Sequence, residues 1–148
     1  MANEEDVRKA SQEFYKALNL MVNGNAEALK VIWSHSEQAT TMHPVGGRQV
    51  GWNDVWNTWN QVAQVSSDGK VELEDQLIFA SGDLAYETGV ENAGFKVAGT
   101  KTEGQVRVTN VYRKENGSWK IVHHHTDLVP AMVEAVSKLQ AGAKESAV

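Results

Sequence analysis

The chain contains no cysteine, only two prolines and no long apolar run. Without cysteine it has no disulfide, no thiolate nucleophile and no cysteine-ligated zinc site. No stretch approaches the roughly 18 consecutive apolar residues that a membrane-spanning helix needs. These absences exclude disulfide-rich scaffolds, cysteine-dependent enzymes and helical membrane proteins.

Basic residues are also scarce. The 14 Lys and Arg residues are outnumbered by 19 Asp and Glu residues, so the net charge is −5 and the pI is ≈ 5.5. A nucleic-acid-binding protein normally carries a basic face, so we expect no nucleic-acid partner. Residues Glu4, Glu5 and Asp6 are acidic where a signal peptide is basic, and no apolar stretch follows them. We therefore expect a cytoplasmic protein with no membrane partner.

The rest of the composition is typical of a globular protein. The chain has 148 residues, of which 41% are hydrophobic and 22% charged. A chain of this length buries about two thirds of its unfolded surface around one core. We predict a single domain over residues 1–148, with a core over residues 6–128 and a C-terminal helix over residues 130–140.

Apolar residues at helical spacing predict two N-terminal helices. The first, over residues 3–23, carries one apolar stripe and ends near Asn23-Gly24. The second is shorter and begins after Asn25. The stripe of the first helix consists of Val7, Ala10, Phe14, Leu18 and Met21.

Residues 49–66 form the most distinctive predicted helix, because three of the five tryptophans fall on one face of it. A stripe of this kind usually packs against a sheet. Trp56, in the middle of the stripe, is therefore expected to be buried. Bulky flat side chains also suit an apolar ligand cavity, so we predict that Trp52, Trp56 and Trp59 form a pocket wall.

The second half of the chain alternates between apolar and polar residues, as strands do. Helices that precede a run of hairpins predict an α+β fold in which the helices cover one face of the sheet. On the other face, Arg107, Thr109 and Val111 need either water or a partner. The predicted strands are a short one over residues 39–42 and longer ones over residues 71–80, 84–91, 105–114 and 119–126. Residues 92–102 are expected to form a connection whose conformation the pattern leaves open.

The last predicted strand contains three consecutive histidines. Because strand side chains alternate between faces, His123, His125 and Asp127 are expected to continue the face that begins with Trp119 and Ile121. On an inward face, His125 and His123 are candidates for a general acid or base, since histidine titrates near neutral pH. Asp127 would then tune them. A structural histidine at the end of a core strand is the alternative.

A His-x-His pair can also ligate a metal, with His43 as a third ligand. The pattern lacks the further glutamate and histidine of a cupin, and we predict no metal site. His43 stands before Pro44 at a strand end, where we expect it at the pocket mouth or in a turn.

Two further positions depend on which face of a strand points inward. If the face of Ala85 and Gly89 is inward, Glu87 is a carboxylate in the pocket and a third catalytic candidate. If that face is outward, Tyr86 points in instead. Asn110 is a candidate for the polar lining, and its amide donates hydrogen bonds but cannot act as an acid.

Several motifs together resemble one family. They are Thr41-Met-His-Pro-Val-Gly-Gly47, the aromatic helix after Gly51, Ser81-Gly-Asp-Leu-Ala85 and Gly117-Ser-Trp-Lys-Ile-Val-His-His-His125. In this order they are similar to the SnoaL-like branch of the nuclear transport factor 2-like superfamily, which includes ketosteroid isomerase. The resemblance implies a cone-shaped, mostly antiparallel sheet wrapped around helices, with one internal pocket and a homodimer formed through the sheet.

The fold alone does not choose a function, since relatives isomerise, dehydrate, hydrolyse, cyclise or only oligomerise. We expect binding or acid–base conversion of a small, partly apolar organic molecule without a cofactor. The alternative is a non-catalytic ligand-binding or oligomerisation module.

Overall fold

The computed structural model describes the backbone of residues 2–146 and the side-chain exposure of residues 3–142. It consists of four helices and six strands within these residues. The helices are α1 (Ala2–Met21), α2 (Leu29–Ile32), α3 (Trp52–Gln64) and α4 (Pro130–Ser146). The strands are β1 (Thr40–His43), β2 (Gly46–Val50), β3 (Ser66–Ser81), β4 (Leu84–Val97), β5 (Thr100–Glu115) and β6 (Ser118–Thr126).

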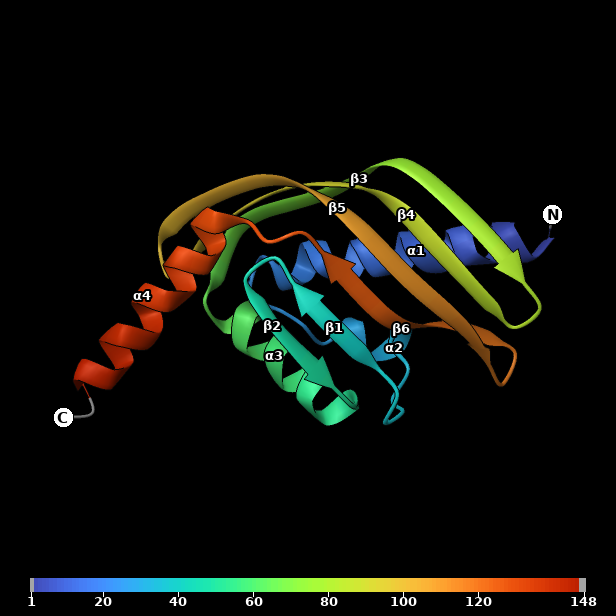
Figure 1. Ribbon diagram of the computed structural model, residues 1–148, viewed down its shortest axis with the longest axis horizontal. Coiled ribbons are helices and arrows are strands. Elements are labelled where there is room, and N and C mark those ends of the chain that lie inside the picture. Colours follow the sequence, from blue (N-terminus) through green and yellow to red (C-terminus); the bar gives the residue numbers. More distant parts are fainter. Residues whose placement is uncertain (1, 147–148) are drawn as a thin grey trace.

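The six strands form one curved sheet in the order β2-β1-β6-β5-β4-β3. Only the β1–β6 pairing is parallel, and the others are antiparallel. Figure 1 shows β3, β4 and β5 arching over α1, with α3 beside β1 and β2 and with α4 projecting from one end. This arrangement confirms the predicted α+β cone. No helix of the described residues is long and apolar enough to cross a membrane.

The apolar stripe of α1 lies against the inner face of the sheet, as its spacing predicts. Phe14 is fully buried and its ring meets Tyr15, Trp33 and Trp59 at centroid distances of 5.1, 6.3 and 6.3 Å. Edge-to-face packing of this kind adds to the free energy gained from apolar burial. The core therefore lies between α1, α3 and the concave side of the sheet.

The connection expected over residues 92–102 is instead a continuation of two long strands. β4 runs to Val97, and β5 begins at Thr100. Ala98 and Gly99 both have positive φ, 50° and 84°, which suits a two-residue hairpin turn. The glycine at position 94 lies within paired strand and does not end it. The sheet is therefore longer than the sequence pattern indicates.

The helix predicted over residues 49–66 is shorter than expected, because a strand occupies its first residues. β2 pairs with β1 in an antiparallel hairpin, with Thr40 opposite Val50. Gly51, at φ 86°, then changes the chain direction and precedes the first turn of α3. The short strand was missed because its residues, Gly46 to Val50, lack alternating apolar side chains.

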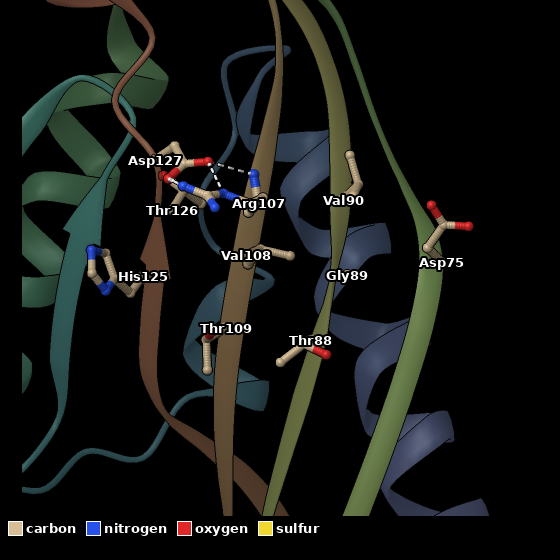
Figure 2. A pocket seen from close by; sticks show the side chains of 10 residues that line it. All are labelled: Asp75, Thr88, Gly89, Val90, Arg107, Val108, Thr109, His125, Thr126 and Asp127. Carbon is tan, nitrogen blue, oxygen red and sulfur yellow. Dashed lines mark hydrogen bonds and ion pairs between the residues drawn. The ribbon is translucent and has the colours of Figure 1, made fainter.

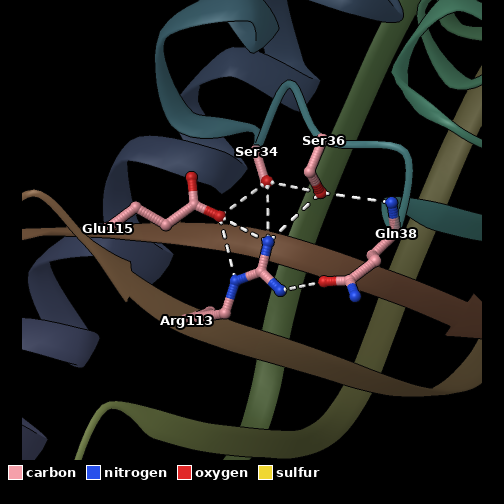
Figure 3. Close-up of polar contacts among 5 residues, drawn as sticks. All are labelled: Ser34, Ser36, Gln38, Arg113 and Glu115. Carbon is pink, nitrogen blue, oxygen red and sulfur yellow. Dashed lines mark hydrogen bonds and ion pairs between the residues drawn. The ribbon is translucent and has the colours of Figure 1, made fainter.

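The loop between α2 and β1 is held to the sheet by a polar cluster (Figure 3). Arg113 on β5 donates to Glu115 at 2.7 and 3.0 Å and also to Ser36 and Gln38 in the loop. Ser34 donates to Glu115 at 2.7 Å. The loop leads directly into β1, so these contacts help to position the strand that carries His43.

Candidate functional site

A β-bulge in β6 decides where the three histidines point. Tyr112 on β5 pairs with Ile121, and its neighbour Val111 pairs with His123, so Val122 is an extra residue in β6. One inserted residue reverses the inward and outward alternation of everything that follows it. The prediction that His123 and His125 share the inner face of Trp119 and Ile121 is therefore wrong.

His124 is the histidine that points into the core. It is 2% exposed, whereas His125 is exposed and His123 is half-buried. The hydroxyl Oγ1 of Thr40 on β1 lies 2.6 Å from Nδ1 of His123, which is a contact between neighbouring strands. The histidine of β6 that is placed to contact a ligand inside the cone is thus His124.

An internal cavity of about 40 Å³ lies between α1, α3 and the sheet. Its walls are mostly apolar, and its polar groups come from His43, Glu91 and His124, each less than 5% exposed. Pro44, Val45, Val62 and Ala93 also line it and are half-exposed. We call these half-buried apolar residues the mouth of the cavity, and we call the three buried polar groups its polar end. Its apolar lining is completed by Leu18, Met21, Val22, Trp59, Val71 and Phe95.

Glu91 on β4 is a carboxyl group buried beside this cavity. Burial raises its pKa to about 7, and the nearby Glu87 adds to the increase. The hydroxyl of Tyr15 donates a 2.7 Å hydrogen bond to its Oε2 and partly opposes the shift. No positive side chain is among the causes of the shift. A carboxyl group with a pKa near 7 is suited to take up and release a proton at neutral pH.

Asn110 connects Tyr15, the hydrogen-bond partner of Glu91, to His124. Its Nδ2 donates to the Tyr15 hydroxyl at 3.1 Å and to Glu87 Oε1 at 2.9 Å. Its Oδ1 accepts from Nδ1 of His124 at 2.7 Å. Burial lowers the pKa of His124 well below its ordinary value, so the ring is neutral. With the proton on Nδ1, Nε2 of His124 is left as a hydrogen-bond acceptor.

Glu87 points inward and is completely buried, which decides the orientation that the sequence left open. It accepts from Tyr112 at 2.9 Å and Gln76 at 2.6 Å, in addition to Asn110. It does not line the cavity. Glu87 therefore organises the polar network behind the cavity wall and is not positioned to contact a ligand in the cavity. Tyr86 correspondingly points outward, with 47% of its surface exposed.

His43 lies beside His124 in the cavity lining, since β1 and β6 are paired and Thr41 is the partner of His124; the two ring centroids are 6.2 Å apart. Burial lowers its pKa to about 4, so it is neutral at physiological pH. Its Nε2 is buried without a hydrogen-bond partner among the described residues. A buried polar atom of this kind costs free energy unless something binds it.

Of the three tryptophans that were predicted to form the pocket wall, only Trp59 lines the cavity. Trp59 is 3% exposed, and its ring centroid is 4.4 Å from that of His43. Trp52 and Trp56 are half-buried and pack against the edge of the core, where His35 stacks on Trp52 and Lys30 lies 4.3 Å from the ring of Trp56. The prediction that Trp56 is buried holds only in part, because Trp56 packs against the core but its ring stays half-buried.

A larger, open groove of about 500 Å³ lies on the outer face of the sheet (Figure 2). It contains the exposed His125 and the ion pair between Arg107 and Asp127, in which Nε and Oδ2 are 2.9 Å apart. Hydrogen bonds from Arg107 lower the pKa of Asp127 to about 2. Asp127 is thus paired with Arg107 and does not tune a histidine inside the cone. Solvent weakens such exposed ion pairs.

The described residues contain no group of three histidine, aspartate or glutamate side chains placed to hold a metal ion. His43, His123 and His125, which the sequence offered as possible metal ligands, do not converge on one point, since His43 points to the inner face of the sheet and the other two lie on the outer side. The ring centroids of His123 and His125 are 6.0 Å apart.

Three important residues were missed by the sequence reasoning. Strict strand alternation places His124 on the face opposite His123 and His125, hence outside, because the bulge leaves no mark in the pattern. Tyr15 lies one residue away from the α1 stripe, yet it is 8% exposed. Glu91 had a usable signal, because it continues the Ala85, Glu87 and Gly89 face and places two carboxyl groups four residues apart on it.

The profile of the SnoaL-like domain matches residues 7–132. The chain belongs to the SnoaL-like domain family. Among curated proteins, the F-box protein SKIP8 of Arabidopsis thaliana is 23% identical over 129 residues, covering 80% of this chain and 53% of that protein. The chain thus spans about half the length of this relative.

Solved structures that include NTF2-like proteins show the same fold. A candidate dehydratase of the NTF2-like family from Streptomyces avermitilis has a TM-score of 0.75 and 25% identity, covering 86% of this chain and 96% of that one. A candidate ketosteroid isomerase from Shewanella frigidimarina has a TM-score of 0.65 and 19% identity, covering 80% of this chain and 92% of that one. These comparisons support the NTF2-like cone fold.

Proposed function

We propose that this SnoaL-like domain binds a small, mainly apolar organic molecule in the internal cavity and converts it by acid–base chemistry. The observation that carries the proposal is the polar end of the cavity. There, a buried carboxyl group with no positive partner, Glu91, lies with two neutral imidazoles, those of His43 and His124. Buried polar groups without complete hydrogen bonding are costly and are typical of functional sites.

The internal cavity is favoured over the outer groove for a physical reason. The charged groups Arg107 and Asp127 in the groove are bonded to each other and exposed to water, so they gain little from a ligand. In the cavity, Nε2 of His43 is buried and has no described partner. Hydrogen bonds formed there are stronger because the local dielectric constant is low.

Glu91 is the proposed acid or base. Its pKa of about 7 makes both protonation states available at neutral pH, and Tyr15 holds one of its oxygens. His124 would hold the ligand through Nε2. The dehydratase description of the Streptomyces avermitilis neighbour is consistent with proton transfer of this kind.

The cavity volume limits what binds without rearrangement. A volume of about 40 Å³ is close to the roughly 30 Å³ share of one water molecule in the liquid. A larger ligand therefore has to extend through the mouth or displace lining side chains. Met21 is in the wall, and methionine adapts readily to a changed shape because it has three rotatable bonds.

A fragment screen followed by NMR tests this proposal. We expect fragments with one polar group to shift the amide signals of residues around His43, Trp59 and His124, with the same affinity in His125→Ala as in the wild type. The Glu91→Gln variant should still bind these fragments but should not catalyse the conversion of any that the wild type converts, because an amide cannot act as a general acid or base. Fragments that shift only signals around His125 and Arg107 would refute the internal site.

We also propose that the outer face of the sheet forms a homodimer. Four large apolar side chains are exposed on the β3–β4 hairpin, Leu77, Phe79, Leu84 and Tyr86, by 57%, 50%, 54% and 47%. The rings of Phe79 and Tyr86 stack at 5.1 Å and form a flat surface. Contiguous exposed apolar patches mark association sites, and this patch is the observation that favours the oligomerisation alternative.

Sedimentation equilibrium tests the dimer. We expect twice the 16.3 kDa chain mass at micromolar concentration, and monomers for Phe79→Asp, since a buried unpaired charge costs several kcal/mol. Leu20→Asp is the matched control, because Leu20 is 45% exposed on α1 and lies outside the patch. A wild-type protein that sediments at 16.3 kDa would contradict the proposal.

A further inference from the structure

The buried network fixes which kind of polar group the cavity accepts. Asn110 directs its Nδ2 to Glu87 and to the Tyr15 hydroxyl, so its Oδ1 is the atom that faces His124. An amide oxygen only accepts, and therefore Nδ1 of His124 carries the proton. Nε2 of the same neutral ring is then restricted to accepting a hydrogen bond. Asn110 thus acts as a positioning residue that sets the tautomer of His124.

His43, on the neighbouring strand of the same sheet face, has no such restriction. His43 is neutral, and its buried Nε2 has no described partner that would select a tautomer through that atom. Nε2 of His43 can therefore either donate or accept. The two imidazoles, with centroids 6.2 Å apart in the lining of one cavity, therefore offer one fixed acceptor and one adaptable group to a polar group that contacts both.

A hydroxyl group satisfies both atoms, because it donates one hydrogen bond and accepts others. A carbonyl group only accepts, so it would leave Nε2 of His124 facing another acceptor. Glu91 adds a carboxyl oxygen to the same end, and its Oε2 already accepts from Tyr15. The other described side chains of the lining are apolar, so they offer no hydrogen bond to a second polar group on the ligand.

We propose that the cavity selects small alcohols: a single hydroxyl lies at the buried end, donates to Nε2 of His124 and accepts from His43, and the apolar remainder faces the mouth between Pro44, Val45 and Val62. This inference rests on the proposed ligand-binding function and adds the class of ligand. It predicts discrimination by hydrogen-bond donation between molecules of the same size.

Cyclohexanol and cyclohexanone test the inference, since they have equal numbers of heavy atoms and differ in the donor. In NMR titrations of the wild-type protein we expect cyclohexanol to bind at least about tenfold more tightly, a difference of about 1.4 kcal/mol. In His124→Phe, which keeps a ring but removes the acceptor, the preference should fall to below about threefold. His125→Ala is the control and should retain the full preference.

A second measurement needs no variant and covers the case in which His124→Phe does not fold. In the wild-type protein with ¹⁵N-labelled histidine, the Nε2 signal of His124 should move on addition of cyclohexanol and stay in place with cyclohexanone. Equal affinities, or tighter binding of the ketone, would overturn the alcohol inference and leave ligand binding in the cavity standing. Binding of neither probe at millimolar concentration would overturn both.

Discussion

Trp59→Ala should lower the free energy of unfolding by about 3–5 kcal/mol, the usual cost of removing a buried aromatic side chain. Trp59 is 3% exposed, and its ring meets Phe14, Trp33 and His124 at centroid distances of 6.3, 6.1 and 5.6 Å. Truncation removes these contacts and joins the empty space to the cavity. Urea denaturation followed by circular dichroism measures the difference.

Trp56→Ala is the matched control, since both tryptophans belong to the same helix. Trp56 is only half-buried at the edge of the core and contacts Lys30, so its truncation should cost less, about 1–2 kcal/mol. If Trp56→Ala proves as destabilising as Trp59→Ala, the orientation of α3 described above is incorrect.

Glu91→Gln should stabilise the protein relative to the wild type, and the gain should grow by about 2–3 kcal/mol between pH 5 and pH 8. Burial raises the folded-state pKa of Glu91 from 4.5 to about 7. Between these two values the folded wild type binds more protons than the unfolded chain, so its stability falls as pH rises. Glutamine keeps the acceptor for Tyr15 and carries no ionisable group.

The difference in the free energy of unfolding between Glu91→Gln and the wild type separates the effect of Glu91 from that of groups whose pH dependence has the opposite sign. His43 has a folded-state pKa lowered to about 4, so it contributes stability that increases with pH between about 4 and 6.5. This contribution is common to both proteins and largely cancels. The other titratable groups close to Glu91 are Tyr15 on α1, Glu87 on β4 and Tyr112 on β5.

Urea denaturation at several pH values measures the effect. Glu74→Gln provides the control, because Glu74 is exposed on β3 and its difference from wild type should stay nearly constant. A constant difference for Glu91→Gln as well would mean that Glu91 is ionised normally in the folded state, and the proposed acid–base role would lose its basis.

Much of the architecture could be predicted from the sequence, because it depends on local periodicity. The stripe of Phe14 and Leu18 needs a sheet to cover it, and the alternation over residues 105–114 matches the centre of β5. The turn at Asn116-Gly117 has the expected positive φ at both residues, 51° and 83°. These features are decided by neighbours within a few residues of one another.

The identity of the site residues could not be read in the same way. Which histidine of β6 faces inward depends on one extra residue, Val122, and that residue is recognised only by the pairing of Tyr112 and Val111 across the sheet. A second irregularity, in β3 between Glu74 and Leu77, allows Gln76 to reach Glu87. Both bulges reverse side-chain direction without a distinctive sequence pattern.

The sequence by itself therefore determined the α+β cone and the family resemblance, along with the presence of histidines and carboxylates on the right strands. Only the tertiary structure decided that His124, Glu91 and Tyr15 form the buried polar network and that His125 lies outside. The physical reason is that strand alternation has a period of two residues, so a single inserted residue exchanges the inner and outer faces. The burial that raises the pKa of Glu91 likewise comes from distant segments of the chain. Its hydrogen-bond partner Tyr15, for example, is 76 residues away in the sequence.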